Sequence, residues 1–369
     1  MNNKNFQTFF DCGFSKIRAG IFNEDNQNEA FYAESDFFID RSNLNEVIQK
    51  IISTFEKDTN EYIDKINLMI DSPQMLSVGI SISKKLDGSR IKKTNVQFLI
   101  QEAKQQILKH YANYNIAHII VNNYKIDNID YSYLPNEIKC DFIALDVIFI
   151  CLPDDLVLYF KNLFLESNIF INQIICSSYA KSINYKNNLN LTEYVSFIDV
   201  GFNKTSIFYY FNDKFLSLDV MPIGGNHITK DISKILKIEL EKAENIKINY
   251  NKNIKFLGED NFSLKIVNKI IFARTQEIIE LCSNSIKSNF FSENQFRILL
   301  MGEGLKTLNK QHSDSSIFLD DIDFLEDTNK NICQSGFKLE KGLNKQEVIV
   351  VPKKQIKQGF FEKLFLFFG

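Results

Sequence analysis

The sequence predicts an α/β protein built from two similar lobes. The first observation is a pair of matching strand–turn–strand segments, Phe9-Phe10-Asp11-Cys12-Gly13 and Phe197-Ile198-Asp199-Val200-Gly201, about half the chain apart and each followed by a second apolar run. The second observation is a further glycine turn, Gly302-Glu303-Gly304, directly after an apolar run. Short strands, tight turns and helices that recur in both halves of a chain are typical of this fold class.

These turns also suggest what the lobes hold. Glycine turns expose backbone N–H groups that can cradle phosphates, and the carboxylates of Asp11 and Asp199 can hold a hydrated metal ion. A single Asp-x-Gly turn between strands is usually a plain hairpin. The order and spacing of the three turns favour a nucleotide clamped between two related lobes.

Composition limits the other possibilities. The 369 residues are too many for one core and fit two lobes, and 44% hydrophobic with 24% charged residues is ordinary for a globular protein. The net charge of −3 gives no indication of nucleic acid as a partner. The six cysteines show no paired spacing, so we expect reduced thiols. We expect neither a signal peptide nor a spanning helix, because no apolar run reaches 18 residues.

In the first half, apolar alternation over residues 6–40 predicts strands, and helical spacing predicts a helix over Asn43 to Lys57. The later elements of this half are two strands within 66–82, a helix over 94–111 capped by Thr94 or Asn95, strands at 116–124 and 141–152, a helix over 153–168 that Pro153 begins, and a strand at 169–175.

The second half repeats the plan. We expect strands at 195–201, 205–211 and 214–221, a glycine turn at 222–226, helices at about 227–236, 239–249 and 265–287, and a strand at 296–301. Residues 306–330 are acidic and lack clear periodicity.

Taken in order, the two hairpins and the later glycine turns resemble the actin-like ATPase superfamily, with its ribonuclease H-like lobes. Four stretches narrow the resemblance to the bacterial cell-division family FtsA: Asp11-x-Gly13-x-Ser15-Lys16, Pro222-Ile223-Gly224-Gly225-Asn226-His227-Ile228-Thr229-Lys230-Asp231-Ile232, Ala243-Glu244-x-x-Lys247, and Ile271-x-x-Arg274-x-x-Glu277-Ile278. The resemblance covers nearly the whole chain and is densest from 195 to 305.

The resemblance implies ATP and Mg²⁺ as ligands and names the residues that would hold them. Asp11 and Asp199 would bind the metal through water. The phosphates would meet Gly13, Ser15, Lys16, Gly201, Lys204 and Thr205. The sugar and base would be framed by Gly224, Gly225, Asn226, Glu244, Lys247, Gly302 and Gly304. No catalytic residue is assigned.

The second phosphate loop departs from the family pattern Asp-Ile-Gly-Gly-Gly-Thr-Thr-Asp. Phe202 and Asn203 replace two glycines, and Ser206 replaces the last acid. Glu303 replaces a further glycine. The close backbone approach that glycine allows is partly lost, although Lys204 adds a positive charge. We therefore expect ATP binding with slow hydrolysis.

The resemblance also implies a division into subdomains. These are 1A at 1–65 and 144–190, an inserted α+β subdomain 1C at 66–143, 2A at 191–225 and 297–343, 2B at 226–296, a linker at 344–355 and an amphipathic helix at 356–369. A generic insertion at 66–143 is the alternative to 1C.

The C-terminal helix is expected to lie in a membrane interface. Its apolar face is formed by Ile356, Phe360, Phe361, Leu364, Phe365 and Phe368. Lys353, Lys354 and Lys357 would favour anionic lipid. An ordinary helix docked on the protein body is the alternative.

The FtsA resemblance implies a division protein that self-assembles in an actin-like manner and tethers FtsZ to the cytoplasmic face of the inner membrane at the division site, helping to recruit other division proteins. Arg274, within 2B, is the candidate contact for the acidic C-terminal peptide of FtsZ. Two other readings stay open: a pilus-assembly adaptor of the same fold without the terminal helix, and a small-molecule kinase of the same superfamily.

Overall fold

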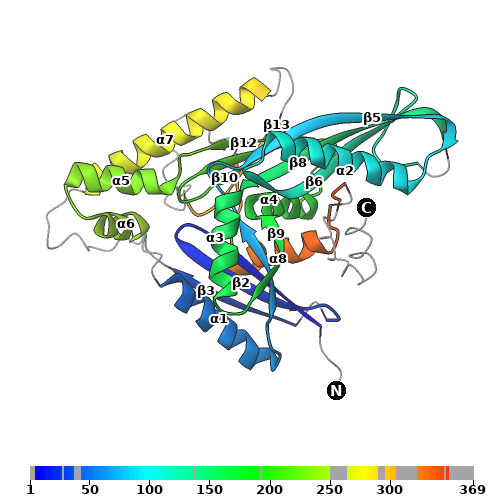
Figure 1. Cartoon of the computed structure of the whole chain (residues 1–369). Helices are drawn as coiled ribbons and strands as arrows, with labels where there is room; N and C mark the ends of the chain where they lie inside the picture. The colour runs from blue at the N-terminus through cyan, green and yellow to red at the C-terminus, as the bar shows by residue number, and fades with distance from the viewer. Residues whose placement is uncertain are drawn as a thin grey trace.

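The computed structural model describes residues 5–26, 29–36, 43–135, 138–191, 193–249, 264–289, 296–304, 322–344 and 346–348. Three sheets and the helices that cover them make up this part of the chain (Figure 1). Two of the sheets share one topology, and the third extends away from them.

The first sheet has the strand order β3-β2-β1-β4-β9. Its strands are β1 (Phe6–Cys12), β2 (Lys16–Asn23), β3 (Ala30–Asp36), β4 (Lys65–Ile70) and β9 (Phe170–Cys176). The first three form an antiparallel meander, and β4 and β9 run parallel to β1. The helices of this lobe are α1 (Leu44–Thr59), α3 (Asp154–Leu165), α4 (Ser177–Asn188) and α8 (Asn329–Glu340).

The second sheet repeats this order as β12-β11-β10-β13-β14. It contains β10 (Tyr194–Val200), β11 (Thr205–Phe211), β12 (Lys214–Met221), β13 (Phe296–Met301) and β14 (Ile322–Phe324). Again an antiparallel meander is followed by two parallel strands. The helices of this lobe are α5 (Gly225–Leu236), α6 (Leu240–Asn249) and α7 (Leu264–Asn289). The two like lobes expected from the hairpins are confirmed.

The third sheet, β5-β8-β6-β7, is antiparallel and is covered by α2 (Lys93–His110). Its strands are β5 (Leu76–Arg90), β6 (Tyr114–Ile126), β7 (Ile129–Tyr131) and β8 (Lys139–Pro153). Helix α2 starts after Lys92 and not at Thr94 or Asn95; the Asn95 side chain instead accepts the Lys92 N–H at 2.8 Å.

The strand pairing departs from the expected boundaries of the insertion, 66–143, at both ends. Strand β4 pairs with β1 and β9 and so lies in the first sheet. Strand β8 pairs with β5 and β6 as far as Pro153 and so lies in the third. Alternate residues of β8 belong to two hydrophobic clusters: Ile150 and Leu152 pack with the first lobe, and Phe149 and Cys151 pack with α2 in the third sheet.

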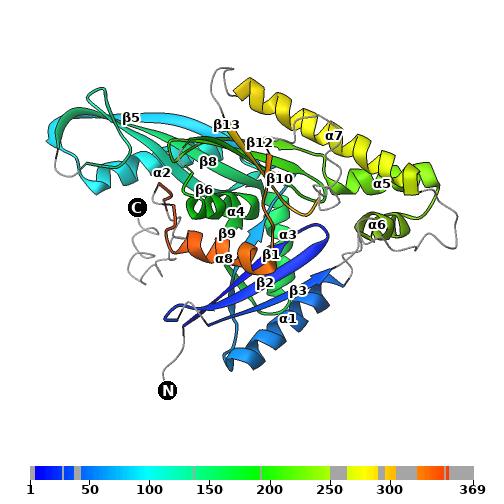
Figure 2. The same cartoon turned by 180° about the vertical axis from the view of Figure 1, so that it is seen from behind.

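Helices α4 and α8 were not expected from the sequence. Helix α8 packs against α4 and the first sheet (Figures 1 and 2), although residues 297–343 were expected to belong to the second lobe. The contact has an aromatic reason: the Phe337 ring of α8 stacks on Phe22 of β2 with centroids 4.7 Å apart. The chain therefore returns to the first lobe after completing the second.

After α8 the chain crosses to the third sheet. The Val348 N–H donates to the Ile119 carbonyl of β6 at 2.8 Å, and the Val121 N–H donates to Gln346 at 2.9 Å. His118 Nδ1 lies 2.5 Å from Glu347 Oε1. The remaining linker and the expected membrane helix, 349–369, lie outside the described residues. None of the helices in the described ranges is long and apolar enough to span a membrane.

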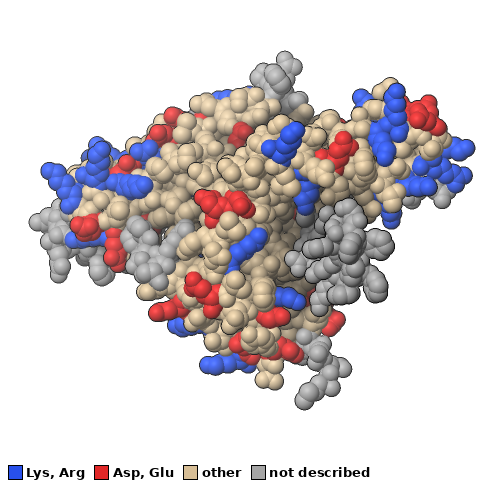
Figure 3. All heavy atoms as spheres, in the orientation of Figure 1, with Lys and Arg blue, Asp and Glu red and all other residues tan. Residues whose placement is uncertain are grey.

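Exposed charges are unevenly distributed. Basic side chains gather at the far end of the third sheet, at the right of Figure 3, where Lys85, Arg90, Lys92 and Lys93 are exposed. In contrast, several acidic side chains, among them Asp11, Asp199 and Asp327, are buried where the two lobes meet. All six cysteines are free and buried, as expected.

Substitution at Gly20 should test the docking of α8. A Cβ atom there would lie 2.8 Å from the Cys333 Cβ of α8 and 3.0 Å from the Phe22 ring. We expect Gly20→Ala to lower the free energy of unfolding by about 1–3 kcal/mol through overpacking, measured by urea denaturation. Gly79→Ala is the matched control, because no atom lies within 4 Å of its Cβ position. Equal stability of the two variants would show that α8 does not pack on β2.

Candidate functional site

The two predicted hairpins close in the same way and face each other across one cavity. The Gly13 N–H donates to the Lys16 carbonyl at 3.0 Å, and the Gly201 N–H donates to the Lys204 carbonyl at 2.8 Å. Eight of the expected ligand residues line the cavity, namely Asp11, Gly13, Ser15, Lys16, Asp199, Gly201, Lys204 and Gly302. The structure therefore brings the phosphate-type turns of both lobes together.

The other expected residues lie beside this cavity, where the glycine turns pack on one another. The Gly225 N–H donates to the Gly201 carbonyl at 3.0 Å, and the Gly304 N–H donates to Val200 at 2.8 Å. A Cβ atom at Gly224 would lie 2.5 Å from the Gly201 oxygen. Gly302 has a φ of +95°, which favours glycine. These glycines are needed for backbone contact within the second lobe.

The residues expected near adenosine are also engaged internally. Lys247 Nζ lies 2.6 Å from Glu244 Oε2 and donates to the Gly225 carbonyl at 3.0 Å. It also donates to Thr229 Oγ1 at 2.8 Å, so α6 is tied to the start of α5. Burial lowers the pKa of Lys247, and the Glu244 carboxylate opposes that effect. Thr205, fully buried, donates to the Ile223 carbonyl at 2.7 Å.

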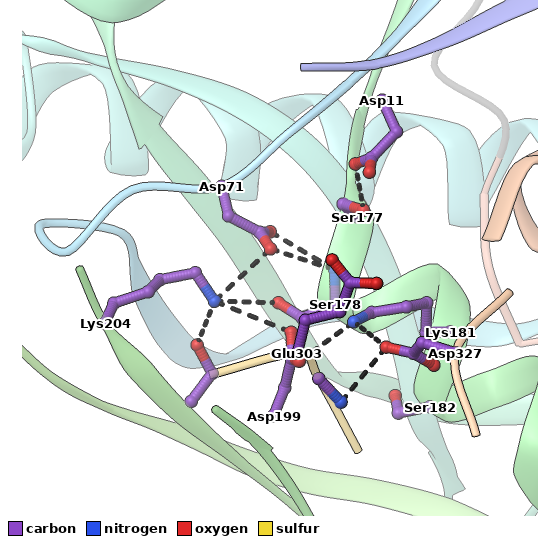
Figure 4. A network of polar contacts seen from close by, with 12 residues as sticks. Asp11, Asp71, Ser177, Ser178, Lys181, Ser182, Asp199, Lys204, Glu303 and Asp327 are labelled. Atoms are coloured by element: carbon purple, nitrogen blue, oxygen red, sulfur yellow. Dashed lines mark hydrogen bonds and ion pairs between the residues drawn. The ribbon is translucent and has the colours of Figure 1, made fainter. Parts of the chain in front are cut away.

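A network of buried charges fills the space between the hairpins (Figure 4). Lys181 of α4 points between two carboxylates: its Nζ lies 2.9 Å from Asp199 Oδ1 and 2.8 Å from Asp327 Oδ2. Asp327 also accepts the Gly302 N–H at 3.0 Å. Burial acts to lower the pKa of Lys181, but the two carboxylates outweigh it and hold this pKa well above its usual range.

Lys204, at the tip of the second hairpin, reaches the first lobe. Its Nζ lies 3.3 Å from Asp71 Oδ2 and 3.8 Å from Asp199 Oδ2, and it donates to Ser206 Oγ at 2.6 Å. Burial alone would raise the pKa of Asp71, but Lys204 and Lys181, with the Ser178 N–H, hold it below its usual value. The ammonium group that was expected to meet phosphate is thus paired within the chain.

Arg18 is the third cation, after Lys181 and Lys204, that forms an ion pair between the two lobes. It lies opposite Asp11 in the β1–β2 register, with Nη1 3.2 Å from Asp11 Oδ2. Its other terminal nitrogen forms an ion pair with Glu303 of the second lobe. The Ser177 hydroxyl donates to Asp11 Oδ1 at 2.6 Å. Burial raises the pKa of Asp11, and Arg18 only partly offsets this.

The ion pairs of Lys181, Lys204 and Arg18 limit the space and the free charge that are left for ATP and Mg²⁺ in the cavity. The cavity measures about 100 Å³, below the roughly 300–1,000 Å³ of most ligand pockets, and several of the cations that line it are paired with carboxylates of the chain. Asp11 and Asp199 each touch a buried cation. A divalent ion about 4 Å from an ammonium group is repelled by about 8 kcal/mol at an effective dielectric constant of about 20.

In this structure a hydrated Mg²⁺ would have to compete with Arg18 and Lys181 for the carboxylates of Asp11 and Asp199. Among the described residues, no group of three or more His, Cys, Asp or Glu side chains is arranged to hold a metal ion.

Several residues of the site were not predicted from the sequence, namely Arg18, Asp71, Lys181 and Asp327. Two of them, Arg18 and Asp71, could have been predicted from strand pairing. Arg18 follows from the hairpin register, and Asp71 follows from the carboxyl end of a strand parallel to β1. Arg274, expected to bind a partner peptide, is instead bidentate to Asp231, at 2.6 and 3.1 Å, and pairs with Glu277.

Comparison with known proteins agrees with this architecture. The family model "Cell division protein FtsA" matches residues 196–282. FtsA of Agrobacterium fabrum is 21% identical over 280 residues, which are 70% of this chain and 62% of that protein. FtsA of Neisseria meningitidis serogroup B is 36% identical over 112 residues, 26% of this chain and 27% of that protein. The chain thus spans less than two thirds of the length of these relatives.

A solved structure, the PilM–PilN type IV pilus biogenesis complex, aligns with a TM-score of 0.61 over 88% of this chain and 89% of that chain. Its 12% identity shows a common fold alone. Together with the repeated sheet order, these matches confirm the resemblance drawn from the motifs: the chain is similar to the cell-division protein FtsA and has the two-lobed actin-like α/β fold.

Proposed function

We propose that this protein is an actin-fold cell-division scaffold that tethers FtsZ to the cytoplasmic face of the membrane at the division site. The match of residues 196–282 to the FtsA family model is the observation that carries the proposal. That stretch includes the second hairpin, the glycine turn at 224–225 and most of α7. Self-assembly and recruitment of other division proteins belong to the same proposal.

We further propose ATP as the ligand of the cavity between the hairpins. The support is the pair of facing turns and the cations around them, Lys16, Arg18 and Lys204. In the closed form these cations are paired with carboxylates of the chain, so the phosphates must compete for them. Binding therefore depends on opening of the lobes, and its apparent affinity is reduced by the fraction of closed molecules.

Hydrolysis is proposed to be slow. Ser206 stands where the family carries an acid, and its hydroxyl accepts a hydrogen bond from Lys204 at 2.6 Å. A serine in this contact cannot act as a carboxylate base at neutral pH. The main use of ATP would then be to set the angle between the lobes.

Two contacts would connect the scaffold to the membrane and to FtsZ. The C-terminal helix at 356–369 is proposed to bind the membrane through anionic lipid. The FtsZ peptide is proposed to approach Arg274, whose side chain is 26% exposed. An acidic peptide there must share or displace the carboxylates of Asp231 and Glu277.

ATP binding can be measured by titration of the purified protein with a labelled nucleotide. We expect saturable binding, weakened about tenfold or more in Lys16→Ala, because a charge-assisted contact to phosphate is removed. Lys57→Ala, at the exposed end of α1, is the control and should bind as the wild type does. Absence of binding at millimolar ATP would remove nucleotide from the proposed function.

Turnover is the second measurement. We expect phosphate release well below about 1 per second, the lower end of ordinary enzyme turnover. A rate at or above that value would favour a small-molecule kinase of the same superfamily over the proposed scaffold.

Membrane binding is the third measurement, by sedimentation with vesicles that contain anionic lipid. Truncation after Val351 should leave a folded protein that no longer sediments, and Phe361→Glu should do nearly the same by placing a charge on the apolar face. Gln358→Glu, on the expected polar face, is the matched control and should keep most of the binding. Full sedimentation of the truncated protein would place the membrane contact elsewhere.

A further inference from the structure

The cleft contains a buried ammonium group, that of Lys181, between two buried carboxylates. We infer that Lys181 takes the place of a bridging divalent cation, so that its ammonium group neutralises Asp199 and Asp327 between the lobes with neither metal nor nucleotide present. This inference concerns the ligand-free protein and does not depend on whether ATP binds.

The geometry of Lys181 is the first argument. A single nitrogen lies within 3 Å of carboxylate oxygens from two separate segments, at 2.9 Å from Asp199 and 2.8 Å from Asp327. Asp199 is the last residue but one of β10 in the second sheet, whereas Lys181 lies on α4, which follows directly after β9 of the first sheet. Figure 4 shows the ammonium group pointing between the two carboxylates. It therefore bridges the lobes as a shared metal ion would.

Burial is the second argument. Lys181 is 7% exposed, and Asp199 and Asp327 are 3% and 6% exposed. Carboxylates so far from water must be paired with a cation or protonated. Without Lys181, the two carboxylates would face each other, with Lys204 3.8 Å from Asp199 as a more distant cation. The lysine is thus the main source of neutralising charge for this pair.

The neighbouring links follow the same arrangement. Lys204 of the second lobe meets Asp71 of the first at 3.3 Å, and Arg18 of the first lobe meets Glu303 of the second. Each joins a cation on one lobe to a carboxylate on the other. Lys181 differs from them because one nitrogen lies within 3 Å of both of its carboxylates, whereas the Lys204 nitrogen lies 3.3 and 3.8 Å from its two and Arg18 uses a different nitrogen for each. Position 181 is therefore where removal of the ammonium group should create a metal site.

Metal rescue tests the inference, with the full chain and no nucleotide or lipid present. For the wild type, we expect the same melting temperature in chelator and in millimolar MnCl₂. Lys181→Ala should melt about 5 °C lower in chelator, because two buried carboxylates lose their partner. Millimolar Mn²⁺ should then restore about 3 °C, because the ion binds only the folded variant.

Matched variants separate a metal site from a general loss of stability. Lys186→Ala removes another buried ammonium group of α4, but its partner Asp213, at 2.8 Å, is exposed, so Mn²⁺ should not stabilise this variant. The double variant Lys181→Ala/Asp327→Asn should lose the response to Mn²⁺, because one of the two carboxylates is gone. Lys181→Gln replaces Lys181→Ala if the latter does not fold, with direct Mn²⁺ binding as the readout.

The outcomes are distinct. Gain of Mn²⁺ stabilisation in a Lys181 variant, with none in the wild type, supports the inference. It is overturned if Mn²⁺ stabilises the wild type equally, or if neither Lys181 variant gains binding, which would make the lysine an ordinary structural ion pair. Failure of ATP binding in a separate titration would affect the proposed function and leave this result unchanged.

Discussion

The ion pairs of Lys181 are the constraint that sets the charge of the junction between the two lobes, beside an apolar cluster that runs through both. Charges buried between two sheets are tolerated only when each has a partner, because water is not available to solvate them. Here the partners come from different segments: β10 supplies Asp199, the chain before α8 supplies Asp327, and α4 supplies the lysine. The network therefore forms only when both lobes are folded and docked.

The same constraint explains the unusual composition of α4. Its buried residues include Ser177, Ser178, Lys181 and Asn184, so the helix has no apolar stripe toward one side. Each polar side chain has a defined partner, such as Asp11 for Ser177 and Tyr210 for Ser182. A helix enclosed on all sides can be polar when its neighbours satisfy its hydrogen bonds.

The sequence predicted those parts of the fold that carry a local signal. Alternating apolar residues gave both meanders, and helical spacing gave α1 and α7 to within two or three residues. Helices α4 and α8 were missed because their burial comes from tertiary pairing and aromatic stacking, which leave little periodicity in the sequence. Strand β8 was predicted, but its place in the middle of the third sheet depends on pairing with β5, from which α2, β6 and β7 separate it in the chain.

The site, like the fold, was predicted only in the parts that have a local sequence pattern. The two hairpin turns and the two aspartates were predicted from their spacing, and the structure places them around one cavity, with the other glycines beside it. The cations that pair with those aspartates could not be predicted as a set, because Arg18, Lys181 and Lys204 come from a strand, a helix and a turn. A motif specifies which backbone groups can meet a ligand, whereas the charge of the site depends on every side chain that folding brings to it.

The side-chain charges of a cleft affect how it responds to ligands. A ligand shifts an equilibrium between two forms only by the difference in its affinity for them. Internal ion pairs stabilise the closed form before any ligand arrives, so an anionic ligand must bind the open form well enough to replace these pairs. In this chain Lys204 and Arg18 are already paired with Asp71 and Glu303. Under the proposed function, the phosphates would have to compete with these carboxylates, so the strength of the ion pairs would matter to nucleotide binding as much as the shape of the hairpins.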